Sequence, residues 1–194
     1  MYKTLFNHIK ATSPDFTDED FNMVIKAVSI KEYPKKSILW KQGEYVRGGG
    51  YVYRGCFRFF MTNTEGQERT TYFALEDYWI GDYNSILYRE PSAQSIEALE
   101  DSIVLFFSNN EFKNLIDHCE GFRKFTLIKR SKAYNASLKR IVDLHESAET
   151  RYLNLMKKYP DALNRIPLYH IASYLGIKPE SLSRLRKKMS EEGK

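Results

Sequence analysis

The chain has 194 residues, which is enough to bury a substantial core in one large domain or two small ones. With 42% hydrophobic and 28% charged residues, intrinsic disorder is not expected, and the net charge of +5 is compatible with an acidic partner such as nucleic acid. No apolar run approaches the roughly 20 residues that span a bilayer, and residues 1–10 carry no apolar stretch like that of a signal peptide. We therefore expect a cytoplasmic protein that has no membrane partner.

The first stretch of the chain, up to about Ile30, is predicted to be helical. Thr17 is followed three residues later by Asp20, which is the pattern of a capping box at the start of a helix.

The second stretch, from about Lys31 to Ser108, has the pattern of β-structure. Short runs rich in aromatic and β-branched residues alternate with glycines, which indicates a sandwich or a jelly-roll barrel. The segment from Asn63 to Gly66 predicts a hairpin turn, and the three glycines at positions 48–50 predict a β-turn between strands. Arg54 and Arg58 are expected to share one face of the alternation.

The third stretch, from about Asn109 to His145, is again predicted to be helical, with a break at Gly121. Its longer part repeats residues at steps of four and three, which is the spacing of a coiled-coil seam with a polar interruption. The seam consists of Leu127, Ser131, Tyr134, Leu138, Ile141 and His145. A helix that packs on its own barrel is the competing interpretation.

The last stretch, residues 147–194, has the pattern of a small helical domain that contains a helix-turn-helix. Ala172 is small where two helices would cross, Gly176 suits a tight left-handed turn, and Pro179 suits the first turn of the second helix. Apolar residues occupy the inward-facing positions, namely Ile171, Leu175, Ile177, Leu182 and Leu185. The alternative is a plain helical hairpin with a solvated charged face.

Over nearly its whole length, and most specifically over residues 166–188, the chain resembles the Crp/Fnr family of bacterial transcription regulators, in particular its short subgroup. The resemblance implies an α+β fold in three parts. Residues 1–120 would form a cyclic-nucleotide-binding-like jelly-roll β-barrel with flanking helices, residues 121–146 a long dimerisation helix, and residues 147–194 a winged-helix-like helix-turn-helix. Because the sequence ends at Lys194, a truncated wing is expected.

The same resemblance implies how the protein is assembled and what it binds. The seam residues Leu127, Tyr134, Leu138 and Ile141 would form a homodimer interface. The expected partners are double-stranded DNA with a palindromic operator, a second copy of the chain, and RNA polymerase.

The second helix of the motif is expected to enter the major groove of DNA. The residues expected to contact DNA are Lys178, Glu180, Ser181, Ser183, Arg184, Lys187 and Lys188. Lysine and arginine neutralise phosphates, whereas arginine and glutamate can also read base edges. The order Glu180, Ser183, Arg184 is similar to that of the oxygen-responsive branch of the family, where the matching residues contact bases. Lys178 stands where a serine or threonine cap is common, which predicts a weaker cap.

The resemblance places an effector pocket at Gly81, Asp82, Arg89, Ser92 and Ala93. Gly81 and Asp82 match the Gly-Glu pair that holds the ribose of cyclic AMP, but Ser92 stands where the phosphate-binding arginine belongs. A cyclic phosphate without its guanidinium loses a charge-assisted bidentate contact. We therefore expect that cyclic AMP does not bind and that any effector is another molecule.

No cofactor or enzymatic activity is expected. The two cysteines, Cys56 and Cys119, are too few for a four-cysteine iron–sulfur cluster. The β-stretch has no histidine to ligate haem or a cupin-type metal. The remaining alternative is a sensor module that binds a cyclic nucleotide or another small molecule and has no specific DNA target.

Overall fold

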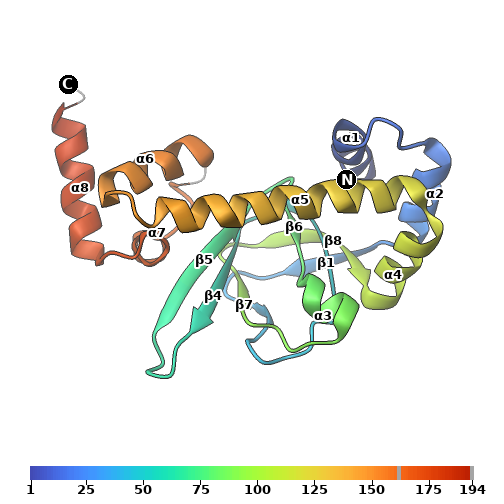
Figure 1. Cartoon of the computed structure of the whole chain (residues 1–194), viewed down its shortest axis with the longest axis horizontal. Coiled ribbons are helices and arrows are strands. Elements are labelled where there is room, and N and C mark those ends of the chain that lie inside the picture. The colour runs from blue at the N-terminus through green and yellow to red at the C-terminus, as the bar shows by residue number, and fades with distance from the viewer. Residues whose placement is uncertain (161–162, 193–194) are drawn as a thin grey trace.

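The computed structural model describes residues 1–160 and 163–192. Its strands form two four-stranded antiparallel sheets that face each other (Figure 1). The first sheet has the order β1 (Ser29–Tyr33), β8 (Ser102–Ser108), β3 (Gly48–Arg54) and β6 (Trp79–Ile80). The second has the order β2 (Ile38–Trp40), β7 (Ser95–Ala98), β4 (Phe57–Thr62) and β5 (Glu68–Ala74). The jelly-roll prediction is thus confirmed as two facing sheets rather than one closed barrel.

Side chains along the strands of the first sheet point alternately to its two faces. The sheet therefore contributes to two separate hydrophobic cores. Val52 of β3 and Val104 of β8 point between the sheets, where they meet Phe57 and Ile96 of the second sheet. Their neighbours point to the opposite face, which the helices α1 (Tyr2–Thr12), α2 (Asp18–Ala27), α4 (Asn109–His118) and α5 (Glu120–Asp143) cover. The first sheet is therefore buried on both faces, as its aromatic and branched residues suggest.

Several local predictions are confirmed. Thr17 and Asp20 form the capping box of α2, in which the Asp20 amide donates to the Thr17 hydroxyl over 3.1 Å. The hairpin between β4 and β5 turns at Gly66, whose φ of 78° is left-handed, and the Asn63 side chain accepts hydrogen bonds from two amides of the turn. The third stretch breaks at Cys119, two residues before the predicted Gly121.

Two predictions for the β-stretch are wrong. The glycines at positions 48–50 lie inside β3 and do not form a turn. A Cβ at Gly49 or Gly50 would collide with the backbone of the strands on either side, so these glycines allow three strands to approach closely. Arg54 and Arg58 do not share a face, because the chain crosses from the first sheet to the second between them.

The C-terminal part consists of α6 (Ala148–Lys158), α7 (Leu168–Leu175) and α8 (Pro179–Glu192). The expected domain boundaries at 120/121 and 146/147 fall close to the two ends of α5, which in Figure 1 runs from the C-terminal helices across the sheets to α2 and α4. Residues 161–162 and 193–194 of the expected last domain lie outside the described residues, and with them the end of the chain on which the truncated wing was predicted. Among the described helices, none is long and apolar enough to cross a membrane.

Candidate nucleic-acid interface and effector cavities

The helix-turn-helix geometry arises from local backbone chemistry. Helix α7 ends at Gly176, whose φ of 69° places it in the left-handed region, and its amide donates to the carbonyl groups of the last helical turn. Helix α8 then begins at Pro179, as predicted. Ala172 and Leu182 have no exposed surface, so the two helices cross at the small residue that the sequence indicated.

The outer face of α8 carries most of the predicted DNA-binding residues. Glu180, Ser183, Arg184 and Lys187 are exposed, as is Lys178 just before the helix, whereas Ser181 is half-buried. Three cationic side chains have polar neighbours. An Arg184 guanidinium nitrogen lies 3.5 Å from the Ser181 hydroxyl, Lys187 lies 4.0 Å from Glu191, and Lys188 lies 3.4 Å from Glu149 of α6. Six of the seven residues are thus exposed, and two of them, Lys187 and Lys188, each have a carboxylate within 4.0 Å.

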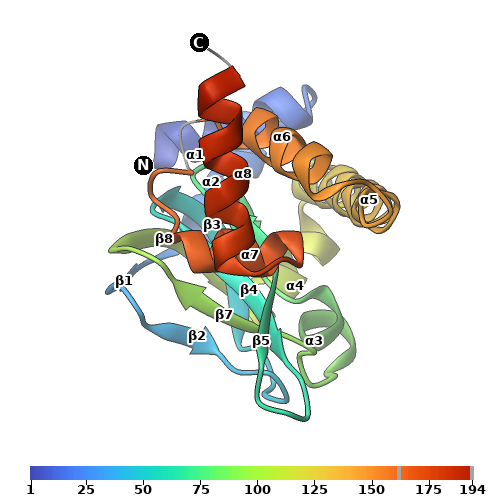
Figure 2. The same ribbon diagram turned by 90° about the vertical axis from the view of Figure 1, so that its left-hand side faces the viewer.

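The helix-turn-helix is anchored on the edge of the second sheet (Figure 2). The Ser173 hydroxyl of α7 accepts a hydrogen bond from the Thr70 amide of β5 over 2.9 Å. Nearby, the Tyr159 hydroxyl donates to the Phe73 carbonyl over 3.1 Å, and Arg165 forms ion pairs with Glu76 and Glu100. The sequence analysis missed this interface, because the residues that contact each other across it are 65 to 103 positions apart in the chain.

Helix α5 presents the predicted seam to solvent. Leu127, Tyr134, Leu138 and Ile141 have 58%, 66%, 45% and 58% of their surfaces exposed. The buried face of the helix is formed by Phe122, Phe125 and Thr126 near its start. The seam therefore does not pack on the chain's own barrel, and the described residues leave it uncovered.

Four of the five predicted effector-pocket residues line one small cavity of about 310 Å³, namely Gly81, Asp82, Ser92 and Ala93. Asp82 caps the short helix α3 (Tyr83–Tyr88) through one carboxylate oxygen, which accepts from the amides of Asn84 and Ser85. Its other oxygen lies 2.7 Å from the Ser92 hydroxyl. The polar groups expected to meet a ligand are thus bonded to one another.

The fifth predicted residue, Arg89, does not line this small cavity. It ends α3 in a left-handed conformation with φ of 56° and lines a second, larger cavity instead.

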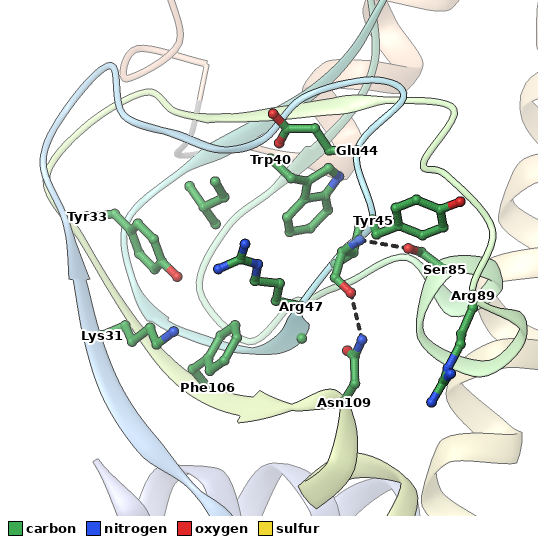
Figure 3. A pocket seen from close by; sticks show the side chains of 13 residues that line it. Lys31, Tyr33, Trp40, Glu44, Tyr45, Arg47, Ser85, Arg89, Phe106 and Asn109 are labelled. Carbon is green, nitrogen blue, oxygen red and sulfur yellow. Dashed lines mark hydrogen bonds between the residues drawn. The ribbon is translucent and has the colours of Figure 1, made fainter.

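The larger cavity, of about 1030 Å³, opens between the edge strands β1 and β2 of the two sheets (Figure 3). Its wall includes cationic side chains, aromatic rings and one carboxylate, contributed by Lys31, Tyr33, Trp40, Glu44, Tyr45, Arg47, Arg89 and Phe106. The sequence analysis did not find this cavity. Its residues come from β1, β2, β8, α3 and the segment before β3, and no local pattern links those segments.

Burial sets the protonation of several groups. Burial raises the pKa of Cys56 to about 12 and that of Cys119 to about 11, so both thiols stay protonated at neutral pH. In α7, burial and the nearby Arg58 lower the pKa of His170 to about 4, so this imidazole is neutral.

Comparisons with known proteins agree with this architecture. Residues 30–119 match the family model of the cyclic nucleotide-binding domain. FixK2 from Bradyrhizobium japonicum is 16% identical, with a TM-score of 0.75 and 86% of each chain covered. The c-di-GMP-responsive global regulator CLP from Xanthomonas campestris is 11% identical, with a TM-score of 0.74, covering 91% of this chain and 93% of its own.

A Crp/Fnr-family transcriptional regulator from Eubacterium rectale is 17% identical, with a TM-score of 0.71, covering 93% of this chain and 86% of its own. A comparison with curated protein sequences finds no match. At these identities the structural likeness concerns the fold.

Proposed function

We propose that this protein is a DNA-binding transcription regulator, because residues 30–119 match the family model of the cyclic nucleotide-binding domain and the fold of the chain is similar to those of FixK2 and of a Crp/Fnr-family regulator. The observation that carries the proposal is the outer face of α8. Glu180, Ser183 and Arg184 are exposed there side by side, while Leu182 anchors the helix from behind. This arrangement suits a helix that lies in the major groove, with Arg184 and Glu180 reading base edges and Lys178 and Lys187 contacting phosphates.

The protein acts as a homodimer through α5. A row of exposed apolar side chains along one helix face is unusual on a monomer and fits a coiled-coil partner. A second copy also doubles the number of base and phosphate contacts, which specific binding requires. The operator is then a palindrome with half-sites about 34 Å apart. Cytoplasmic location and contact with RNA polymerase follow from this role, and no enzymatic activity is assigned.

The decisive experiment is selection of operators from a random DNA pool with the full-length protein, followed by affinity measurements at several salt concentrations. We expect a palindromic consensus and an affinity that falls steeply with salt, since phosphate contacts release counterions. Enrichment of no sequence, together with a flat salt dependence, would instead favour a sensor module that has no DNA target.

A further inference from the structure

The larger cavity has a wall that is fixed in place before any ligand arrives. The segment before β3 forms one side of it. The Val46 amide donates to the Ser85 hydroxyl of α3 over 2.7 Å, and the Asn109 side-chain amide donates to the Val46 carbonyl over 2.6 Å (Figure 3). On the opposite side, the edge strands β1 and β2 belong to different sheets and leave the space between them open.

The charges at this cavity are predominantly positive. Lys31, Arg47 and Arg89 line it, and Glu44 is its one carboxylate. Glu44 accepts a hydrogen bond from the Lys41 amide of its own turn. Across residues 1–160 and 163–192, none of the three cationic side chains forms an ion pair. Figure 3 shows the guanidinium of Arg47 reaching into the middle of the cavity.

The walls offer flat apolar surfaces beside these charges. The Lys31 ammonium group lies 3.6 Å from the centre of the Phe106 ring, so the ring and the charge face the same space. Trp40 and Tyr33 contribute two more rings. Burial raises the pKa of Tyr33, which therefore remains a neutral hydrogen-bond donor.

Two buried polar atoms at the cavity lack partners. Within the described part of the chain, neither the indole nitrogen of Trp40 nor the side-chain oxygen of Asn109 forms a hydrogen bond. Trp40 is 93% buried, since only 7% of its surface is exposed. Because both atoms are buried beneath the surface, a ligand in the open cavity would not reach them, and they place no requirement on its chemistry.

We propose that the larger cavity binds an aromatic carboxylate. The carboxylate would meet Arg47 and Lys31, and the ring would lie against the aromatic walls. This site is separate from the small cavity at Asp82 and Ser92, and Trp40 is the one large side chain that lines both.

A carboxylate fits the cavity better than a phosphate does. Phosphate sites usually combine cationic side chains with several backbone N–H groups, often at the start of a helix. Here the Asp82 side chain caps the start of α3, and the Val46 amide is bonded to Ser85. The donors that remain are side chains, among them the cations Lys31 and Arg47, and these two suit a single carboxylate.

The test is titration calorimetry of the full-length protein, without DNA, using 4-hydroxycinnamate, 4-hydroxybenzoate and indole-3-acetate. We expect at least one acid to bind saturably with a micromolar Kd, and its methyl ester to bind about tenfold more weakly because the ester has no charge. Arg47→Gln and Lys31→Gln should each weaken binding of the acid about tenfold, and Arg47→Lys should weaken it less. Both residues are exposed, so these variants should fold.

Two matched variants locate the site. Lys3→Gln removes an exposed cation on α1, outside the cavity lining, and Asp82→Asn alters the small cavity; neither should change the Kd. The proposal is overturned if none of the acids binds at millimolar concentration, if the ester binds as well as the acid, or if Asp82→Asn rather than Arg47→Gln abolishes binding. Because no DNA is present, failure here leaves the proposed DNA-binding function intact.

Discussion

The hydroxyl of Ser92 lies 2.7 Å from the carboxylate of Asp82, so the two side chains expected to hold a cyclic nucleotide hold each other. Ser92 is also almost fully buried, with 2% of its surface exposed. A cyclic nucleotide would have to break this bond, and it would find no arginine at the small cavity to compensate its phosphate.

We therefore predict that neither cyclic AMP nor cyclic GMP binds with physiological affinity. Titration calorimetry should show no saturable heat at cyclic nucleotide concentrations up to about 1 mM. A Kd of that size corresponds to a binding free energy of only about −4 kcal/mol. A low-micromolar Kd would contradict this prediction. In that event Arg89 or Arg69 would have to supply the phosphate contact, and Arg89→Gln and Arg69→Gln would identify which of them does.

Arg184→Ala is predicted to weaken the free energy of binding to the selected operator by about 1–3 kcal/mol and to leave the fold unchanged. A bidentate contact between arginine and guanine contributes a free energy of that size. Arg184 is exposed, and its contact with Ser181 is long, so little stability depends on it. Fluorescence anisotropy with operator DNA measures the effect, and Arg54→Ala, at an exposed position of the barrel, is the matched control. Operator affinity equal to that of the parent would show that Arg184 does not read a base.

The double variant Leu138→Asp and Ile141→Asp is predicted to be monomeric, since two carboxylates in each copy would be buried against an apolar seam. Sedimentation velocity at micromolar concentration should show a dimer for the parent and a monomer for the variant. Ala136→Asp places a single carboxylate at an exposed position on the opposite side of α5 and should remain dimeric. A parent protein that sediments as a monomer would rule out the seam as a stable interface.

The stability of the protein is predicted to fall as the pH drops below about 6.5. His170 has its pKa lowered to about 4 by burial and by Arg58, whereas an unfolded histidine titrates near 6.5. Between these two pH values the unfolded chain binds more protons than the folded chain. The contribution of the neutral His170 to the free energy of unfolding is therefore fully present above pH 6.5 and is lost as the pH falls toward 4.

Urea denaturation at pH 7 and pH 5 measures this effect. His170→Gln should weaken the pH dependence without removing it, because burial and Lys129 also lower the pKa of His8 to about 4. Identical pH profiles for the parent and His170→Gln would exclude His170 as the group responsible.

Features set by neighbouring residues could be predicted from the sequence. The capping box at Thr17, the turn at Gly66, and the motif formed by Ala172, Gly176 and Pro179 each depend on a few consecutive positions. Their geometry follows from local hydrogen bonds and backbone sterics, so the pattern is sufficient.

Features that depend on distant segments could not be predicted in this way. Three consecutive glycines suit a tight turn as well as a crowded strand, and only the positions of β6 and β8 decide between them. Arg58 forms ion pairs with Glu68 and Glu97, which lie on two different strands. The alternation of polar and apolar residues in the sequence therefore does not predict that Arg58 is buried. The larger cavity likewise arises only when β1 and β2 end up as the edges of separate sheets.

The hydrogen bond between Ser173 and Thr70 also bears on the solubility of the barrel. Strand β5 is an edge of the second sheet, and α7 occupies the position where another strand could otherwise add. An open edge of this kind is a template for intermolecular pairing and aggregation. Removing residues 147–194 would uncover the Thr70 amide together with Phe73 and Leu75, which are buried beneath the helices. The helix-turn-helix therefore also protects this sheet edge from self-association.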